Sequence, residues 1–166
     1  MSSPTHVNPL VAAVSVIAPA GVACAAADIS YVIILVWSKG GNPFRMLQGI
    51  AYSVLGKATY DGGVATAALG LTLHIGVALM AATLYFLLYR TLPWVRWQWL
   101  GSGVLFGALF YTFMQLVVLR LTLMPRTTFP PPHWVPIFIA HITVVGPVIA
   151  FITHRLLGRL AASSPA

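Results

Sequence analysis

Four long apolar stretches constrain this chain more than any other feature of its sequence. They cover residues 10–37, 64–89, 99–124 and 135–157. A helix needs roughly 20 predominantly apolar residues to cross the hydrocarbon core of a bilayer, and each stretch meets that length. Because backbone polar groups must be satisfied inside lipid, these stretches predict four transmembrane helices. The expected fold class is all-α: a polytopic membrane protein built as a four-transmembrane-helix bundle.

The tryptophans support these boundaries independently. Indole rings prefer the interface between lipid and water, so tryptophans gather near the ends of membrane spans. All five tryptophans lie at or near an end of an apolar stretch: Trp37, Trp94, Trp97, Trp99 and Trp134.

Composition places the chain in a bilayer. Hydrophobic residues make up 59% of its 166 residues and charged residues only 7%, at a mean hydropathy of +0.90. This length fits a single membrane domain, residues 1–166. The net charge of +7 comes from cations placed singly at the ends of apolar runs, which suits lipid phosphates better than nucleic acid. We therefore expect the lipid bilayer, and no nucleic acid, as a partner.

Basic residues divide almost evenly between the two sides of the predicted bundle. With four spans, both termini share one side with Arg90, Arg96, Arg155 and Arg159. The other side carries Lys39, Arg45, Lys57 and Arg126. The positive-inside rule gives a near tie. Because the arginines on the terminal side lie at helix ends without acidic neighbours, we expect both termini in the cytoplasm.

The segment between the first two spans predicts a short amphipathic helix over residues 43–56. Asn42-Pro43 is a typical helix start, and Gly56 ends the pattern. One face carries Phe44, Leu47, Ala51, Val54 and Leu55, and the other carries Arg45, Gln48 and Tyr52. Such a helix lies on the membrane surface or dips into the bundle. An ordinary structured loop is the alternative.

Three ionisable residues interrupt the apolar helices: Asp28, His74 and His141. Ionisable groups inside a membrane are costly unless paired or hydrated, and they mark functional sites by default. Counted from the side of the first and third loops, they lie about 14, 15 and 9 Å deep at 1.5 Å per residue. We therefore expect them at similar depth.

Small residues indicate which way these side chains point, because small residues mark helix–helix contacts in membranes. His74 shares a helix face with Gly70, Ala78, Ala81 and Tyr85, and Asp28 shares one with Gly21, Cys24 and Tyr31. Both are expected to point inward. Tyr85 joins the ligand candidates, as does Arg120, which snorkels to the interface or contacts a phosphate.

Several functions are compatible with this constellation. His74 and His141 are candidate ligands of a haem b, and Cys24, Asp28, His74 and His141 are candidate ligands of a transition metal such as zinc or copper. Asp28 with a histidine is suited to relaying protons or cations, or to polarising a lipid or quinone headgroup. Alternatively, Asp28 and a histidine form a buried pair that only fixes helix packing.

No catalytic motif is visible in the sequence, and no residue is predicted to be catalytic. We expect a non-enzymatic membrane protein that binds a partner, lipid or ion. Gly103 and Gly107 form a GxxxG pair, which favours close helix packing. This pair makes a homo-oligomer, or a subunit of a larger membrane complex, the expected assembly.

Several short patterns follow one another between Gly41 and about Arg155, roughly two-thirds of the chain. They are Ile50-Ala51, Leu55-Gly56, Leu73-His74, Gly103-x-x-x-Gly107 with Tyr111 and Met114, and His141 followed by Val145-Gly146-Pro147. In this combination the chain resembles a group of small uncharacterised bacterial inner-membrane proteins. The resemblance implies a multi-pass four-helix architecture in the bacterial cytoplasmic membrane and carries no catalytic residue. Members usually have a proline within the end of the third helix, where this chain has Arg120-Leu121-Thr122 before Pro125.

Overall fold

The computed structural model describes residues 9–126, 128–132 and 134–162, and the described residues form helices and no strand. The α-helices are α1 (Pro9–Ser38), α2 (Pro43–Leu55), α3 (Gly63–Thr91), α4 (Pro93–Trp97), α5 (Trp99–Phe113), α6 (Trp134–Ala140) and α7 (Gly146–Ala162). Two short segments are 3-10 helices, η1 (Gly56–Asp61) and η3 (Leu119–Leu121). Two others are π-helical, η2 (Met114–Val118) and η4 (His141–Val145).

The four predicted membrane spans are confirmed. Helices long and apolar enough to cross a membrane cover Ala13–Ser38, Gly63–Thr91, Trp99–Leu121 and Trp134–Ala162. The third span ends three residues earlier than predicted, because the backbone becomes extended at Thr122, ahead of Pro125. The fourth span continues beyond residue 157 to Ala162. The fourth span also continues through Pro147. Its departure from regular α-helical geometry is the π-helical turn η4.

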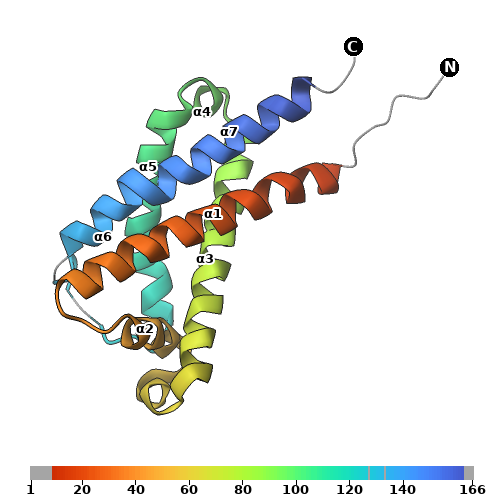
Figure 1. The fold of residues 1–166 in the computed structure, drawn as a ribbon. Helices are drawn as coiled ribbons and strands as arrows, with labels where there is room; N and C mark the ends of the chain where they lie inside the picture. The colour runs from red at the N-terminus through yellow and green to blue at the C-terminus, as the bar shows by residue number, and fades with distance from the viewer. Residues whose placement is uncertain (1–8, 127, 133, 163–166) are drawn as a thin grey trace.

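The helices form a bundle with two distinct ends (Figure 1). α1 packs against α3 and α7, and α5 packs against α7. The start of α1, the end of α7 and the short helix α4 lie at one end, which we call the α4 end. α2 and η1 lie at the opposite end, the α2 end. The chain after η3 also reaches this end, since the backbone N–H of Leu123 donates to the carbonyl oxygen of Ser53, 2.9 Å away.

α2 begins and ends where the sequence predicts. The Asn42 side chain accepts hydrogen bonds from the backbone N–H groups of Phe44 and Arg45, and Pro43 occupies the first helical position. Gly56 ends the helix with a φ of 60°, a conformation that glycine adopts without steric cost. The helix prediction is therefore correct, and the loop alternative is wrong.

Gln48, on the polar face of α2, points into the protein. Gln48 is only 2% exposed, whereas Phe44, Val54 and Leu55 are exposed. The Gln48 amide donates to Thr66 Oγ1, 3.1 Å away, and also lies within hydrogen-bonding distance of two backbone carbonyls of η1 and α3. In a bilayer apolar residues are tolerated on the outside, while polar groups need partners in the interior, so Gln48 points inward.

The GxxxG pair packs within the chain rather than between chains. A side chain on Gly103 would meet Ala150 and the Gly146 backbone, and one on Gly107 would collide with the His141 carbonyl. Gly146 in turn contacts the backbone of α5. The predicted close packing is confirmed, but its partners are α7 and η4. This face therefore gives no support to a homo-oligomer.

Candidate functional site

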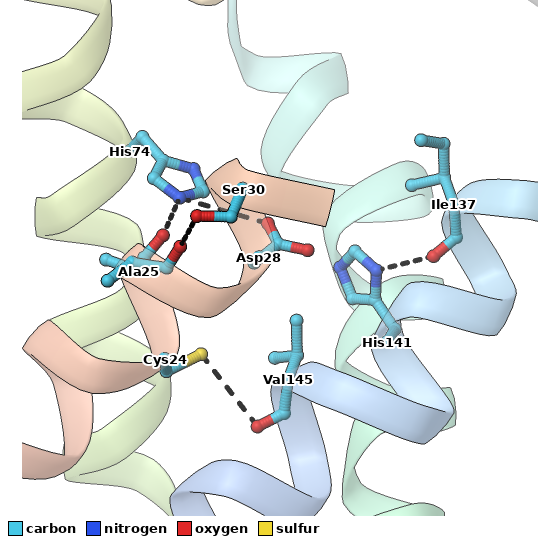
Figure 2. Close-up of polar contacts among 9 residues, drawn as sticks. Cys24, Ala25, Asp28, Ser30, His74, Ile137, His141 and Val145 are labelled. Carbon is cyan, nitrogen blue, oxygen red and sulfur yellow. Dashed lines mark hydrogen bonds and ion pairs between the residues drawn. The ribbon is translucent and has the colours of Figure 1, made fainter. Parts of the chain in front are cut away.

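The three ionisable residues converge in the interior of the bundle. Asp28 lies on α1, His74 on α3, and His141 is the first residue of η4. His74 Nε2 is 3.9 Å from Asp28 Oδ2, and Asp28 interacts electrostatically with both histidines. Figure 2 shows the Asp28 carboxylate between the two imidazole rings. The expected similar depth of the three residues and the inward direction of Asp28 and His74 are confirmed.

These side chains line one small cavity, which we call the central cavity. Its volume is about 170 Å³, and its polar lining residues are Cys24, Asp28, His74, Tyr111, Gln115 and His141. Tyr111 was not predicted as a site residue. The signal that identifies it is its position one helical turn beyond Gly107 and two turns beyond Gly103, on the stripe of α5 that faces inward.

Backbone hydrogen bonds determine where His141 carries its proton. His141 Nδ1 lies 2.8 Å from the Ile137 carbonyl oxygen, which can only accept. Nδ1 therefore donates, and in the neutral ring Nε2 is an acceptor. The second ring nitrogen points toward Asp28 in Figure 2. His141 thus offers a basic nitrogen to the central cavity.

His74 faces the same carboxylate with a hydrogen-bond donor, whereas His141 presents an acceptor. Its Nε2 lies 3.1 Å from the Ala25 carbonyl oxygen, so this nitrogen must carry a proton. The same N–H lies near Asp28 Oδ2. Asp28 consequently has a proton donor on one side and a proton acceptor on the other.

Two buried oxygen atoms in the cavity lining have no hydrogen-bond partner among the described residues. They are Asp28 Oδ1 and the Tyr111 hydroxyl. A buried polar atom without a partner costs free energy. Both atoms line the central cavity, so both are available to a polar group that enters it.

The proposed metal set does not assemble among the described residues. They contain no group of three or more His, Cys, Asp or Glu side chains placed to share a metal ion. The Cys24 thiol instead donates to the Val145 carbonyl oxygen, 3.8 Å away, on η4. Cys24 therefore joins α1 to η4, which explains its burial without a metal.

A haem between His74 and His141 does not fit this geometry. Bis-histidine ligation needs both rings directed at one iron atom across a flat slot. Here Asp28 lies between the rings, and His74 Nε2 is bonded to a backbone carbonyl. The central cavity is also smaller than the roughly 300–1,000 Å³ typical of small-molecule sites. The haem hypothesis is therefore not supported.

Two larger cavities adjoin the central cavity on the side of the α2 end. The first, of about 330 Å³, shares Tyr111 and Gln115 with it and is also lined by Arg120 and Arg126; we call it the arginine cavity. The second, of about 690 Å³, shares Asp28 and His74 with it and includes Arg45 and several other α2 residues; we call it the α2 cavity. Arg120 thus lies next to the central cavity without lining it.

Toward the α4 end, closely packed side chains fill the bundle. Ala20, Tyr85 and Ile149 are at most 1% exposed, and Phe106 packs edge-on against Tyr85. The Tyr85 hydroxyl lies 2.8 Å from Ser102 Oγ, away from the ionisable trio. Tyr85 therefore belongs to the packed region and does not line the central cavity. The cavities that share lining residues with the candidate site therefore lie toward the α2 end, and packed side chains lie toward the α4 end.

The sequence analysis also missed a polar cluster near the α4 end. His154 Nδ1 lies 2.7 Å from the Tyr89 hydroxyl, and its ring stacks on Trp99. This contact joins α3, α5 and α7. In the sequence, Tyr89 and Trp99 cannot be told apart from aromatic residues that only anchor a helix at the membrane interface, so this structural contact was not predictable.

Comparison of the chain with protein-family models, with curated proteins and with solved structures finds no match.

Proposed function

We propose that this membrane protein binds and releases protons at Asp28, as the central site of a small proton relay reached from the α2 end. One observation carries the proposal: Asp28 Oδ1 is buried with no hydrogen-bond partner among the described residues, and the carboxylate lies between a protonated nitrogen of His74 and an acceptor nitrogen of His141. A proton on Asp28 removes the buried charge and gives the carboxyl group a hydrogen to donate.

The charges around the approach favour a proton over a metal cation. The charged residues lining the two adjoining cavities, apart from Asp28 itself, are Arg45, Arg120 and Arg126. These guanidinium groups repel Na⁺, K⁺ and divalent ions. A proton can instead pass along hydrogen bonds between water, tyrosine, glutamine and histidine. The cavity lining supplies such groups in Tyr111, Gln115 and His141.

Infrared difference spectroscopy tests this proposal directly. Asp28 and Asp61 are the only acidic side chains in the sequence. Lowering the pH is expected to produce carboxylic-acid C=O bands, one of which disappears in Asp28→Asn because that variant has no carboxyl group at the site. Asp61→Asn is the matched control, since Asp61 is exposed at the end of η1. A spectrum of Asp28→Asn identical to that of the natural protein would contradict the proposal.

We place the protein in the bacterial cytoplasmic membrane with the α4 end in the cytoplasm, so that the central cavity opens to the outside. Arg90 and Arg96 support this orientation because they lie in the last turns of α3 and α4, at the α4 end. The test is labelling of engineered cysteines in a Cys24→Ala background in intact cells. A membrane-impermeant maleimide is expected to modify Lys57→Cys and to spare Arg159→Cys. The reverse pattern would invert the orientation.

A further inference from the structure

The arginine cavity has the composition of a binding site for an anionic headgroup. Its volume of about 330 Å³ falls within the range of ligand sites. Arg120 and Arg126 supply two positive charges, and Tyr111 and Gln115 supply further polar groups. Arg120 lies in η3 at the end of the third span, and Arg126 lies in the connection that follows. The site is therefore at the depth of lipid headgroups.

Neither arginine forms an ion pair with any residue that the structure describes. The sequence contains only two acidic side chains to neutralise its nine basic ones. One of the two, Asp28, lies beside His74, and the other, Asp61, lies in η1. The chain therefore has few anions of its own for Arg120 and Arg126, and their charges are left for an external anion.

The remaining walls of the arginine cavity are apolar. They include Trp134 and Ile137 from α6 and a proline-rich stretch of the third connection. A small soluble ion makes no favourable contact with such apolar walls. A lipid can place its phosphate at the arginines and its glycerol and upper acyl carbons against Trp134 and Ile137. Arginine also matches the geometry of phosphate oxygens by bidentate hydrogen bonding.

From these observations we infer that Arg120 and Arg126 bind the phosphate group of an anionic phospholipid in the arginine cavity. The lipid sits at the mouth of the central cavity, because Tyr111 and Gln115 line both spaces. This site does not depend on the proton chemistry of Asp28, and either can fail without the other.

Native mass spectrometry of the full chain in dodecyl maltoside micelles measures this binding. Phosphatidylglycerol is titrated into the natural protein and into Arg120→Gln/Arg126→Gln. The double substitution is expected to weaken binding of the first lipid at least tenfold. The matched control is Lys39→Gln/Lys57→Gln, which removes two exposed positive charges at the same end of the bundle but outside this cavity. Its affinity is expected to stay within twofold of the natural protein.

The outcomes of the titration separate the possibilities. Equal weakening in both double variants overturns the site, because it shows a general attraction between charge and lipid. Unchanged binding in Arg120→Gln/Arg126→Gln also overturns the site. If Arg120→Lys/Arg126→Lys retains most of the affinity, the positive charge is confirmed as the feature that binds the lipid. Inorganic phosphate is then added in millimolar excess. Failure to displace phosphatidylglycerol supports a lipid ligand, whereas displacement overturns it in favour of free phosphate.

Discussion

Gly146→Ala is expected to destabilise the folded protein by about 3 kcal/mol, because the new methyl group has no space. Its Cβ would collide with the carbonyl group of Gly103 and would lie 2.9 Å from the backbone nitrogen of Gly107. Both are helix backbone atoms, which cannot rotate away as a flexible side chain can. Unfolding in mixed micelles of mild detergent and dodecyl sulfate measures the change in free energy.

The matched control for this prediction is Gly101→Ala, on the exposed side of α5. A Cβ at Gly101 meets nothing within 4 Å, and alanine is the better helix former by about 0.5–1 kcal/mol. Gly101→Ala is therefore expected to be neutral or stabilising. Similar losses of stability in Gly101→Ala and Gly146→Ala would show that the close crossing of α5 and α7 does not hold the bundle together.

Asp28→Asn is expected to lower proton flux into proteoliposomes at least about 100-fold, the lower range for loss of a positioned proton-transfer group. Asparagine has the size of aspartate, but its side chain neither gains nor loses a proton to change its charge near neutral pH. A pH-sensitive dye trapped inside the vesicles records the flux after a pH jump. Asp28→Glu is expected to retain part of it, because the carboxyl group remains.

The control for the flux experiment is again Asp61→Asn, which changes the other acidic side chain and leaves the central cavity intact. Thermal unfolding of Asp28→Asn separates function from packing, since the variant is expected to fold as stably as the natural protein within about 1 kcal/mol. Loss of folding in Asp28→Asn, with no proton flux in the natural protein, would favour the packing interpretation of Asp28 and His74.

The sequence was sufficient to predict the spans and the depth of the site. Length and hydropathy set the four helices, because the bilayer leaves few alternatives to a helix of about 20 residues. Counting residues along those helices placed Asp28, His74 and His141 at one level, and the small residues Gly70 and Ala78 gave the rotation of α3 correctly.

Other features had no readable signal. The π-helical turn at His141–Val145 lies against Gly107, a residue far away in sequence, and no local pattern of residues predicts it. Tyr85 shares a helix face with His74 but lies eleven residues later, about 16 Å along the axis, so sharing a face did not mean sharing a cavity. The burial of Gln48 in α2 also had no signal, because an amphipathic pattern does not tell whether the polar face contacts the membrane surface or the bundle.

The one-sided approach to Asp28 has an energetic consequence in a living membrane. Ten residues separate Asp28 from the end of α1 at Ser38, about 15 Å, or half the hydrocarbon thickness. A proton that reaches this carboxylate therefore crosses up to half of the transmembrane electric field. At a membrane potential of 100 mV this is worth up to about 1.2 kcal/mol, or roughly a sevenfold change in the proton-binding constant of Asp28. On the proposed function, the protonated fraction of Asp28 is therefore expected to differ between energised and de-energised cells at the same external pH.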